Sequence, residues 1–256
     1  MKTLRALAAL LSYPSTDLIE AADEIRQAID GDVLLPSTVR AELHRLIDDL
    51  AGGDLYDLQE RYGLLFDRTR SLSLHLFEHV HGESRDRGQA MVDLLKLYEE
   101  SGYTPTAAEL PDFLPLFLEY ASTRPPQAAI ELVGQPANVI AALRERLAKR
   151  SSPYVAVMSA LLAISKARLD ERALATLRAE PDPEPDDLEA LDAAWEEEEV
   201  TFGPGAADAT GACSVEGLST RLRAAMRPAE GVAPPLTHGR STGRHATAPS
   251  NSGVRS

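Results

Sequence analysis

Apolar residues recur at helical spacing through the first two thirds of the chain. From Ser15 to Ile29, and again from Ser37 to Leu50, they stand three or four positions apart and so fall on one face of a helix. No long stretch alternates with a period of two, which is the pattern of a half-buried strand. The pattern predicts an all-α fold, a single bundle of roughly nine or ten helices.

The predicted helices are separated by proline and glycine residues, which interrupt helices, and several begin at a residue that can cap the first turn. Asp54, for example, is predicted to open the helix that carries Tyr62 and Phe66. The predicted helical segments are 3–12, 15–29, 37–50, 54–66, 71–80, 83–101, 109–121, 136–150 and 153–168.

The composition changes after Arg178. Residues 180–199 contain 11 acidic residues and no Lys or Arg, and nearly half of the residues from Thr201 onward are Gly, Pro, Ser or Thr. A segment with so few large apolar side chains cannot bury enough surface to offset the entropy of ordering it. Charge runs are usually solvated, so the acidic residues are interpreted mainly as keeping the chain in solution. The predicted divisions are an all-helical domain over 1–178, an acidic segment over 179–200 with room for a short helix, and a disordered tail over 201–256.

Charge and cysteine content narrow the classes of function. The net charge is −14 at pH 7, which disfavours nucleic acid as a partner and suits a basic peptide or protein. The single cysteine, Cys213, excludes an internal disulfide framework and a cysteine-based metal cage. No apolar stretch reaches the roughly 18 residues of a membrane span, and no secretory signal is visible. We expect a cytoplasmic protein without direct membrane insertion.

One short motif has the form of a metal site. His75-Leu-Phe-Glu78-His79 matches the H-x-x-E-H pattern of inverted zinc peptidases, in which two histidines one helical turn apart hold zinc. Such peptidases also need a glutamate ligand far downstream, and residues 147–169 contain none. A structural interpretation is that the leucines around the motif are core positions and its charged residues form solvated ion pairs. A zinc peptidase and a general helical adaptor remain the alternative functions.

A longer run is far more specific than this motif. Residues 76–94 (LFEHVHGESRDRGQAMVDL), together with Phe66-Asp67, Ser73-Leu74 and residues 109–120 (ELPDFLPLFLEY), resemble the nitrate reductase molybdenum cofactor assembly chaperones, the delta subunit family. The resemblance covers roughly residues 4–170.

The resemblance implies an all-helical chaperone and not an enzyme. Such a protein binds the N-terminal peptide of the apo nitrate reductase α subunit and keeps that subunit competent before it docks at the membrane. The client then receives molybdopterin guanine dinucleotide and an iron–sulfur cluster, and the chaperone itself is expected to hold no cofactor or metal stably. The resemblance also implies a hinge at Glu109, Pro111 and Asp112, with Phe113 where the wider group has histidine. Whether Asp112 caps or bends the chain around the prolines or contacts the peptide stays open.

We expect the client to bind as an amphipathic helix in an apolar groove with an acidic rim. The oligomeric state stays open between a monomer and a domain-swapped dimer. The candidate client-binding residues are Tyr62, Phe66, Phe77, Glu78, His79, His81, Glu83, Asp86, Met91, Asp112, Phe113 and Phe117.

Overall fold

The computed structural model describes residues 1–81, 85–105 and 109–183, together with residues 187 and 189. The chain divides into two units, Met1–Met226 and Arg227–Ser256, and everything below concerns the first, because no residue of the second is described. The predicted disordered tail, and all of the predicted acidic segment beyond residue 183 except residues 187 and 189, lie outside the described residues.

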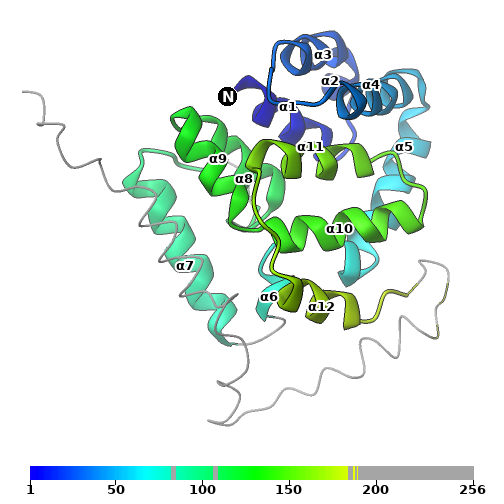
Figure 1. Cartoon of the computed structure of the whole chain (residues 1–256). Helices are drawn as coiled ribbons and strands as arrows, with labels where there is room; N and C mark the ends of the chain where they lie inside the picture. Colours follow the sequence, from blue (N-terminus) through cyan, green and yellow to red (C-terminus); the bar gives the residue numbers. More distant parts are fainter. Residues whose placement is uncertain (82–84, 106–108, 184–186, 188, 190–256) are drawn as a thin grey trace, which may run out of the picture. The chain divides into compact units, whose positions relative to one another are not determined.

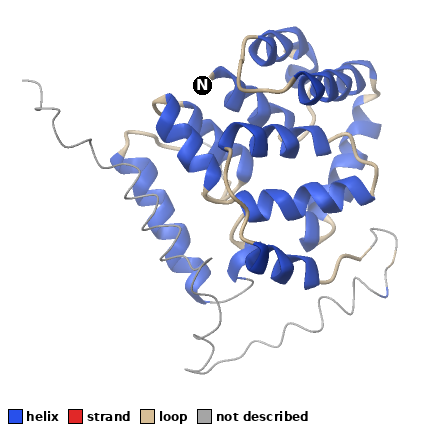
Figure 2. Cartoon of the chain, in the orientation of Figure 1, coloured by secondary structure: helices blue, strands red, loops and turns tan. Residues whose placement is uncertain are grey.

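The described residues form an all-α fold, as predicted, and contain twelve α-helices (Figures 1 and 2). The α-helices are α1 (Lys2–Leu10), α2 (Thr16–Glu20), α3 (Ala22–Asp30), α4 (Ser37–Gly52), α5 (Leu55–Tyr62), α6 (Glu78–His81), α7 (Arg85–Glu100), α8 (Leu114–Ser122), α9 (Pro126–Gly134), α10 (Ala137–Lys149), α11 (Val155–Ser165) and α12 (Glu171–Ala179). A π-helical turn, η1 (Gly63–Asp67), and a 3-10 turn, η2 (Arg70–Leu72), follow α5.

The number of helices exceeds nine or ten for three reasons. The helix predicted from residue 15 to residue 29 is divided at Ala21 into α2 and α3. In addition, α9 was not predicted, although Pro125 precedes it and Pro126 occupies its first position, where proline is tolerated. Helix α12 was not predicted either, since the last predicted segment ends at residue 168. The expected cap at Asp54 is confirmed, because its carboxylate accepts hydrogen bonds from the N–H groups of Tyr56 and Asp57.

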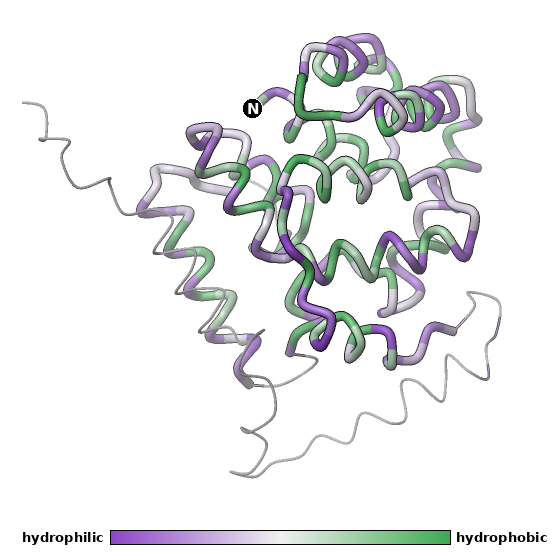
Figure 3. Tube along the Cα trace, in the orientation of Figure 1, coloured by the Kyte–Doolittle hydropathy of each residue, from purple (hydrophilic) through white to green (hydrophobic). Residues whose placement is uncertain are grey.

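The core is centred on α11, which packs against α4, α9 and α10. Its sequence, VAVMSALLAIS, has no charged residue, and hydrophobic positions dominate its path in Figure 3. A helix that is apolar on nearly all sides is stable in water only when other helices surround it. Helix α1 makes the other large contact, with α8, and it also packs against α3.

The helices predicted over 71–80 and 109–121 are both wrong in their first halves. Helix α6 begins only at Glu78, and α8 begins only at Leu114. The backbone before each helix forms hydrogen bonds with the other segment, from Leu76 to Asp112 and from Leu114 to Leu74. Pro111 and Pro115 favour this outcome, since each lacks an N–H and each disfavours helical geometry in the residue before it.

Candidate functional site

Two of the segments that carry the family resemblance meet in the fold. We call the pair formed by residues 73–77 and 110–114 the junction. The N–H of Leu76 donates to the carbonyl of Asp112 at 3.1 Å, and the N–H of Leu114 donates to the carbonyl of Leu74 at 2.8 Å. His75 and Phe113 form an antiparallel β-bridge between these bonds, and their ring centroids lie 5.3 Å apart. A short piece of strand-like pairing therefore joins the chain before α6 to the chain before α8.

Asp112 fastens the junction through its side chain. The side chain is fully buried, one carboxylate oxygen accepts the N–H of Phe77 at 2.9 Å, and the other lies 3.3 Å from Nδ1 of His75. A buried carboxylate is stable only when hydrogen bonds or opposite charge replace its hydration. Both of the contacts that meet this need come from residues 73–77, so Asp112 has a structural role in the described fold.

His75 is the side-chain partner of this carboxylate. The hydrogen bond to Asp112 raises the pKa of His75, although partial burial opposes the rise. Its side chain is 26% exposed, so the ring lies at the edge of the junction where a protein partner could reach it. Glu78, half-buried nearby, forms an ion pair with Arg87 at 2.9 Å, which ties α6 to α7.

Four of the aromatic residues expected to line a groove lie in the core: Tyr62, Phe66, Phe77 and Phe117 are each no more than 5% exposed. Tyr62 and Phe66 pack with Tyr154, and the Tyr62 hydroxyl donates to the carbonyl of Leu11 at 2.8 Å. In the described conformation these rings hold η1 against the bundle. Met91 and Phe113 are only partly buried.

The histidines of the H-x-x-E-H motif do not share a helical face. His75 precedes α6, whereas Nε2 of buried His79 lies 2.8 Å from the carbonyl of Ser73. Burial lowers the pKa of His79 to about 4, and burial also lowers the pKa of His81, whose ring packs against Phe77. Within the ranges that the structure describes, no group of three or more His, Cys, Asp or Glu side chains is arranged to hold a metal ion. These positions oppose the peptidase interpretation.

The remaining candidate residues are Glu83, Asp86 and the hinge residues Glu109 and Pro111. Asp86 is exposed near the start of α7, and Glu83 lies outside the described residues. Of the hinge residues, Glu109 is exposed, and the carbonyl of Pro111 accepts the Tyr98 hydroxyl at 2.7 Å. The last contact fastens α7 to the hinge.

Sequence reasoning assigned no role to two residues at the edge of the junction. Asp67 ends η1, and partial burial raises its pKa, with the charges of His75 and Glu109 close enough to act on it. Leu110, which follows Glu109 in the sequence, is 45% exposed. Asp67 is part of the Phe66-Asp67 pair that carries the family resemblance, but nothing in its spacing indicated that it would lie near Glu109, more than 40 positions away. The edge of the junction thus combines carboxylates with exposed apolar surface.

Acidification is expected to destabilise the fold through His79. Its pKa is lower in the folded than in the unfolded state, so the unfolded chain binds more protons below about pH 6.5, and stability falls as pH falls toward 4. We expect His79 to account for a loss of about 2 kcal/mol between pH 7 and pH 5. Urea denaturation at both pH values checks this. His79→Gln, which keeps a hydrogen-bond donor, should lose that part of the pH dependence, and an equal slope in both proteins would contradict the prediction.

These observations define a class of protein. The described helices enclose one apolar core, and the junction is built from hydrogen bonds and ring packing, with acidic and apolar side chains exposed at its edge. None of the helices in the described part of the chain combines the length and the apolar character needed to cross a membrane. The class that the described fold defines is an all-α protein with one apolar core.

Comparison with known proteins identifies the family. Residues 33–160 match the model of the nitrate reductase delta subunit family, and this range contains the whole junction. The chain is 44% identical over 193 residues to the nitrate reductase molybdenum cofactor assembly chaperone NarJ of Escherichia coli (strain K12), covering 75% of this chain and 81% of that protein. The chain therefore belongs to the nitrate reductase delta subunit family.

Two further relatives agree. The probable nitrate reductase molybdenum cofactor assembly chaperone NarW of Escherichia coli (strain K12) is 40% identical over 202 residues, which cover 79% of this chain and 84% of that protein. The probable chaperone NarJ of Bacillus subtilis (strain 168) is 31% identical over 161 residues, covering 63% of this chain and 86% of that protein. All three relatives are named as assembly chaperones and not as catalysts.

Proposed function

We propose that this protein is an assembly chaperone that binds the N-terminal peptide of the apo nitrate reductase α subunit. It keeps that subunit open while molybdopterin guanine dinucleotide and an iron–sulfur cluster are inserted. The cofactors are cargo of the client, and the chaperone's own residues only hold the client. The activity belongs in the cytoplasm, before the client reaches the membrane. The observation that carries the proposal is the family match, which includes both segments of the junction.

The edge of the junction is the part of the described surface that we assign to client binding. Leu110 and the partly buried Phe113 supply apolar area, and Asp67 and Glu109 supply negative charge. An amphipathic helix with basic residues beside its apolar face would meet both. A few apolar anchors, offset by the cost of ordering the peptide, give an affinity in the micromolar range, about −8 kcal/mol, which allows release after loading.

Calorimetric titration of the full chain with a synthetic peptide from the N-terminus of the same organism's nitrate reductase α subunit tests the proposal. Leu110→Ala is expected to weaken binding about tenfold, because it removes an apolar anchor of about 1–2 kcal/mol. Leu169→Ala is the matched control, since Leu169 is 37% exposed and lies outside the junction. Equal affinities for the two variants would remove the junction from the binding surface. If the wild-type chain does not bind the peptide at all, a general helical adaptor becomes the better function.

Charge at the same surface is tested separately. Glu109→Lys should weaken peptide binding, and the difference from wild type should shrink as salt is raised, because exposed charges are screened. Glu24→Lys makes the same charge change at an exposed position of α3 and should weaken peptide binding less. A loss that is equal in the two variants would show that only the net charge matters.

A further inference from the structure

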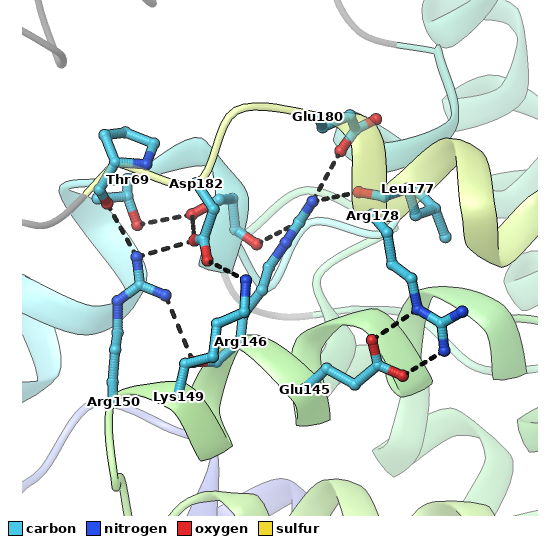
Figure 4. Close-up of polar contacts among 11 residues, drawn as sticks. Thr69, Glu145, Arg146, Lys149, Arg150, Leu177, Arg178, Glu180 and Asp182 are labelled. Atoms are coloured by element: carbon cyan, nitrogen blue, oxygen red, sulfur yellow. Dashed lines mark hydrogen bonds and ion pairs between the residues drawn. The ribbon is translucent and has the colours of Figure 1, made fainter.

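Residues 177–183, which we call the strap, cross α10 at the end of the described bundle (Figure 4). The guanidinium of Arg150 donates to the carboxylate of Asp182 and to the carbonyl of Pro183, both at 2.8 Å. Lys149 lies 3.4 Å from the other oxygen of Asp182. The strap is therefore held by the basic side chains at the C-terminal end of α10.

Arg146 holds the strap from a more buried position. Its side chain is 4% exposed, and it donates to the carbonyl of Leu177 at 2.5 Å and to the carboxylate of Glu180 at 3.3 Å. Burial alone would raise the pKa of Asp182, but hydrogen bonds from Arg150 and Ser71 outweigh burial and lower it, so the carboxylate stays ionised. The expectation that the acidic run is simply solvated is thus wrong for Glu180 and Asp182.

The same groups also hold the η2 turn. Asp182 accepts a hydrogen bond from the Ser71 hydroxyl at 2.8 Å, and Arg146 donates to the Ser71 carbonyl at 2.7 Å. Ser71 is therefore held through both its side chain and its backbone, by residues at least 75 positions away. Two short-range backbone bonds also belong to the turn, from Leu72 to Thr69 and from Ser73 to Arg70.

The turn leads directly into the junction. Ser73, two residues after Ser71, offers its carbonyl to the ring of His79, and the carbonyl of Leu74 accepts the N–H of Leu114. The three residues from Ser71 to Ser73 thus join the strap to the site. A movement of Ser71 would be transmitted to Ser73 and Leu74, because no flexible linker separates them.

We propose that the strap is a clasp that positions the junction, with Asp182 as its positioning residue. When Asp182 is ionised and bound, Ser71 is fixed and residues 73–77 pair with residues 110–114. When Asp182 is released, Ser71 loses its side-chain bond and keeps only the bond from Arg146 to its carbonyl, so the junction opens more often. Weaker client binding on release rests on the function proposed above, but the effect on the junction does not.

Amide hydrogen exchange of the free full-length chain tests the clasp. Asp182→Asn is expected to raise exchange at the amides of Leu76, Phe77 and Leu114 at least fivefold and to leave the amides of α11 unchanged. Ser71→Ala, a milder change, should raise the same amides in the same direction. Glu145→Gln is the matched control, since it breaks the exposed ion pair between Glu145 and Arg178, a contact of the strap that does not involve Asp182 or Ser71. Unchanged exchange at the junction amides in both Asp182→Asn and Ser71→Ala would overturn the proposal. An equal rise in exchange at the amides of α11 would also overturn it.

Titration with the α-subunit peptide separates the two proposals. Faster exchange with several-fold weaker peptide binding supports the clasp as a determinant of client affinity. Faster exchange with unchanged binding overturns that part of the inference. Faster exchange in a protein whose wild type binds no peptide leaves the clasp in place and removes the proposed function.

Discussion

Replacing Arg146 with methionine is expected to lower the free energy of unfolding by about 2–4 kcal/mol. The guanidinium is buried and joins the Ser71 carbonyl, the Leu177 carbonyl and Glu180, so its loss leaves two carbonyls without a donor and a carboxylate without its charge partner. Methionine fills much of the same volume, so the loss reports the polar contacts more than a cavity. Urea denaturation at pH 7 measures the effect.

Two further variants serve as controls for Arg146→Met. Arg144→Met changes an exposed arginine on the same helix and is expected to alter stability by less than about 0.5 kcal/mol. Arg146→Lys keeps the charge but not the planar fork that reaches several acceptors, so it should recover only part of the loss. If Arg146→Met is as stable as Arg144→Met, the buried arginine has no net stabilising role.

Asp112→Ala is expected to cost a similar amount, about 2–4 kcal/mol. The substitution leaves the buried N–H of Phe77 without an acceptor and His75 without its negative partner. Asp112→Asn keeps an oxygen for that N–H and should lose less than half as much. Asp23→Ala, at an exposed position in α3, serves as the control and should fall within about 1 kcal/mol of wild type. Thermal denaturation compares all four proteins.

The structural role of Asp112 affects the interpretation of binding data. A loss of client binding in Asp112→Ala would follow from a disrupted junction as readily as from a lost contact with the peptide. Leu110 and Glu109 are better probes of binding, because their side chains are exposed and are not needed to hold the junction.

The elements that could be predicted from the sequence are those whose cause is local. The stripe of apolar residues in α4 and the Asp54 cap depend on neighbours within a few positions, and both were predicted correctly. His75 illustrates the opposite case, since its spacing from His79 is helical but its backbone pairs with Phe113. Pairing between segments so far apart has no local signal.

The same limit explains the positions of the candidate site residues. Tyr62 and Phe66 lie within the part of the chain that the resemblance covers and are large and mainly apolar, properties that a core residue and a groove residue share. Burial distinguishes the two, and burial depends on which distant elements cover a side chain. The strap was missed for a related reason. Asp182 belongs to a run of acidic residues that is typical of a solvated segment, and only the fold brings it to Arg150.

Asp112 also closes a loop. Its bond to Phe77 spans 35 residues, and α6 and α7 lie within that span. The loop from Phe77 to Asp112 begins and ends at the junction, so its closure has a single entropic cost. Breaking the few bonds at the junction would restore most of that chain entropy. Opening of this loop should therefore be cooperative, with both ends of the α6–α7 segment released in a single event rather than by gradual fraying.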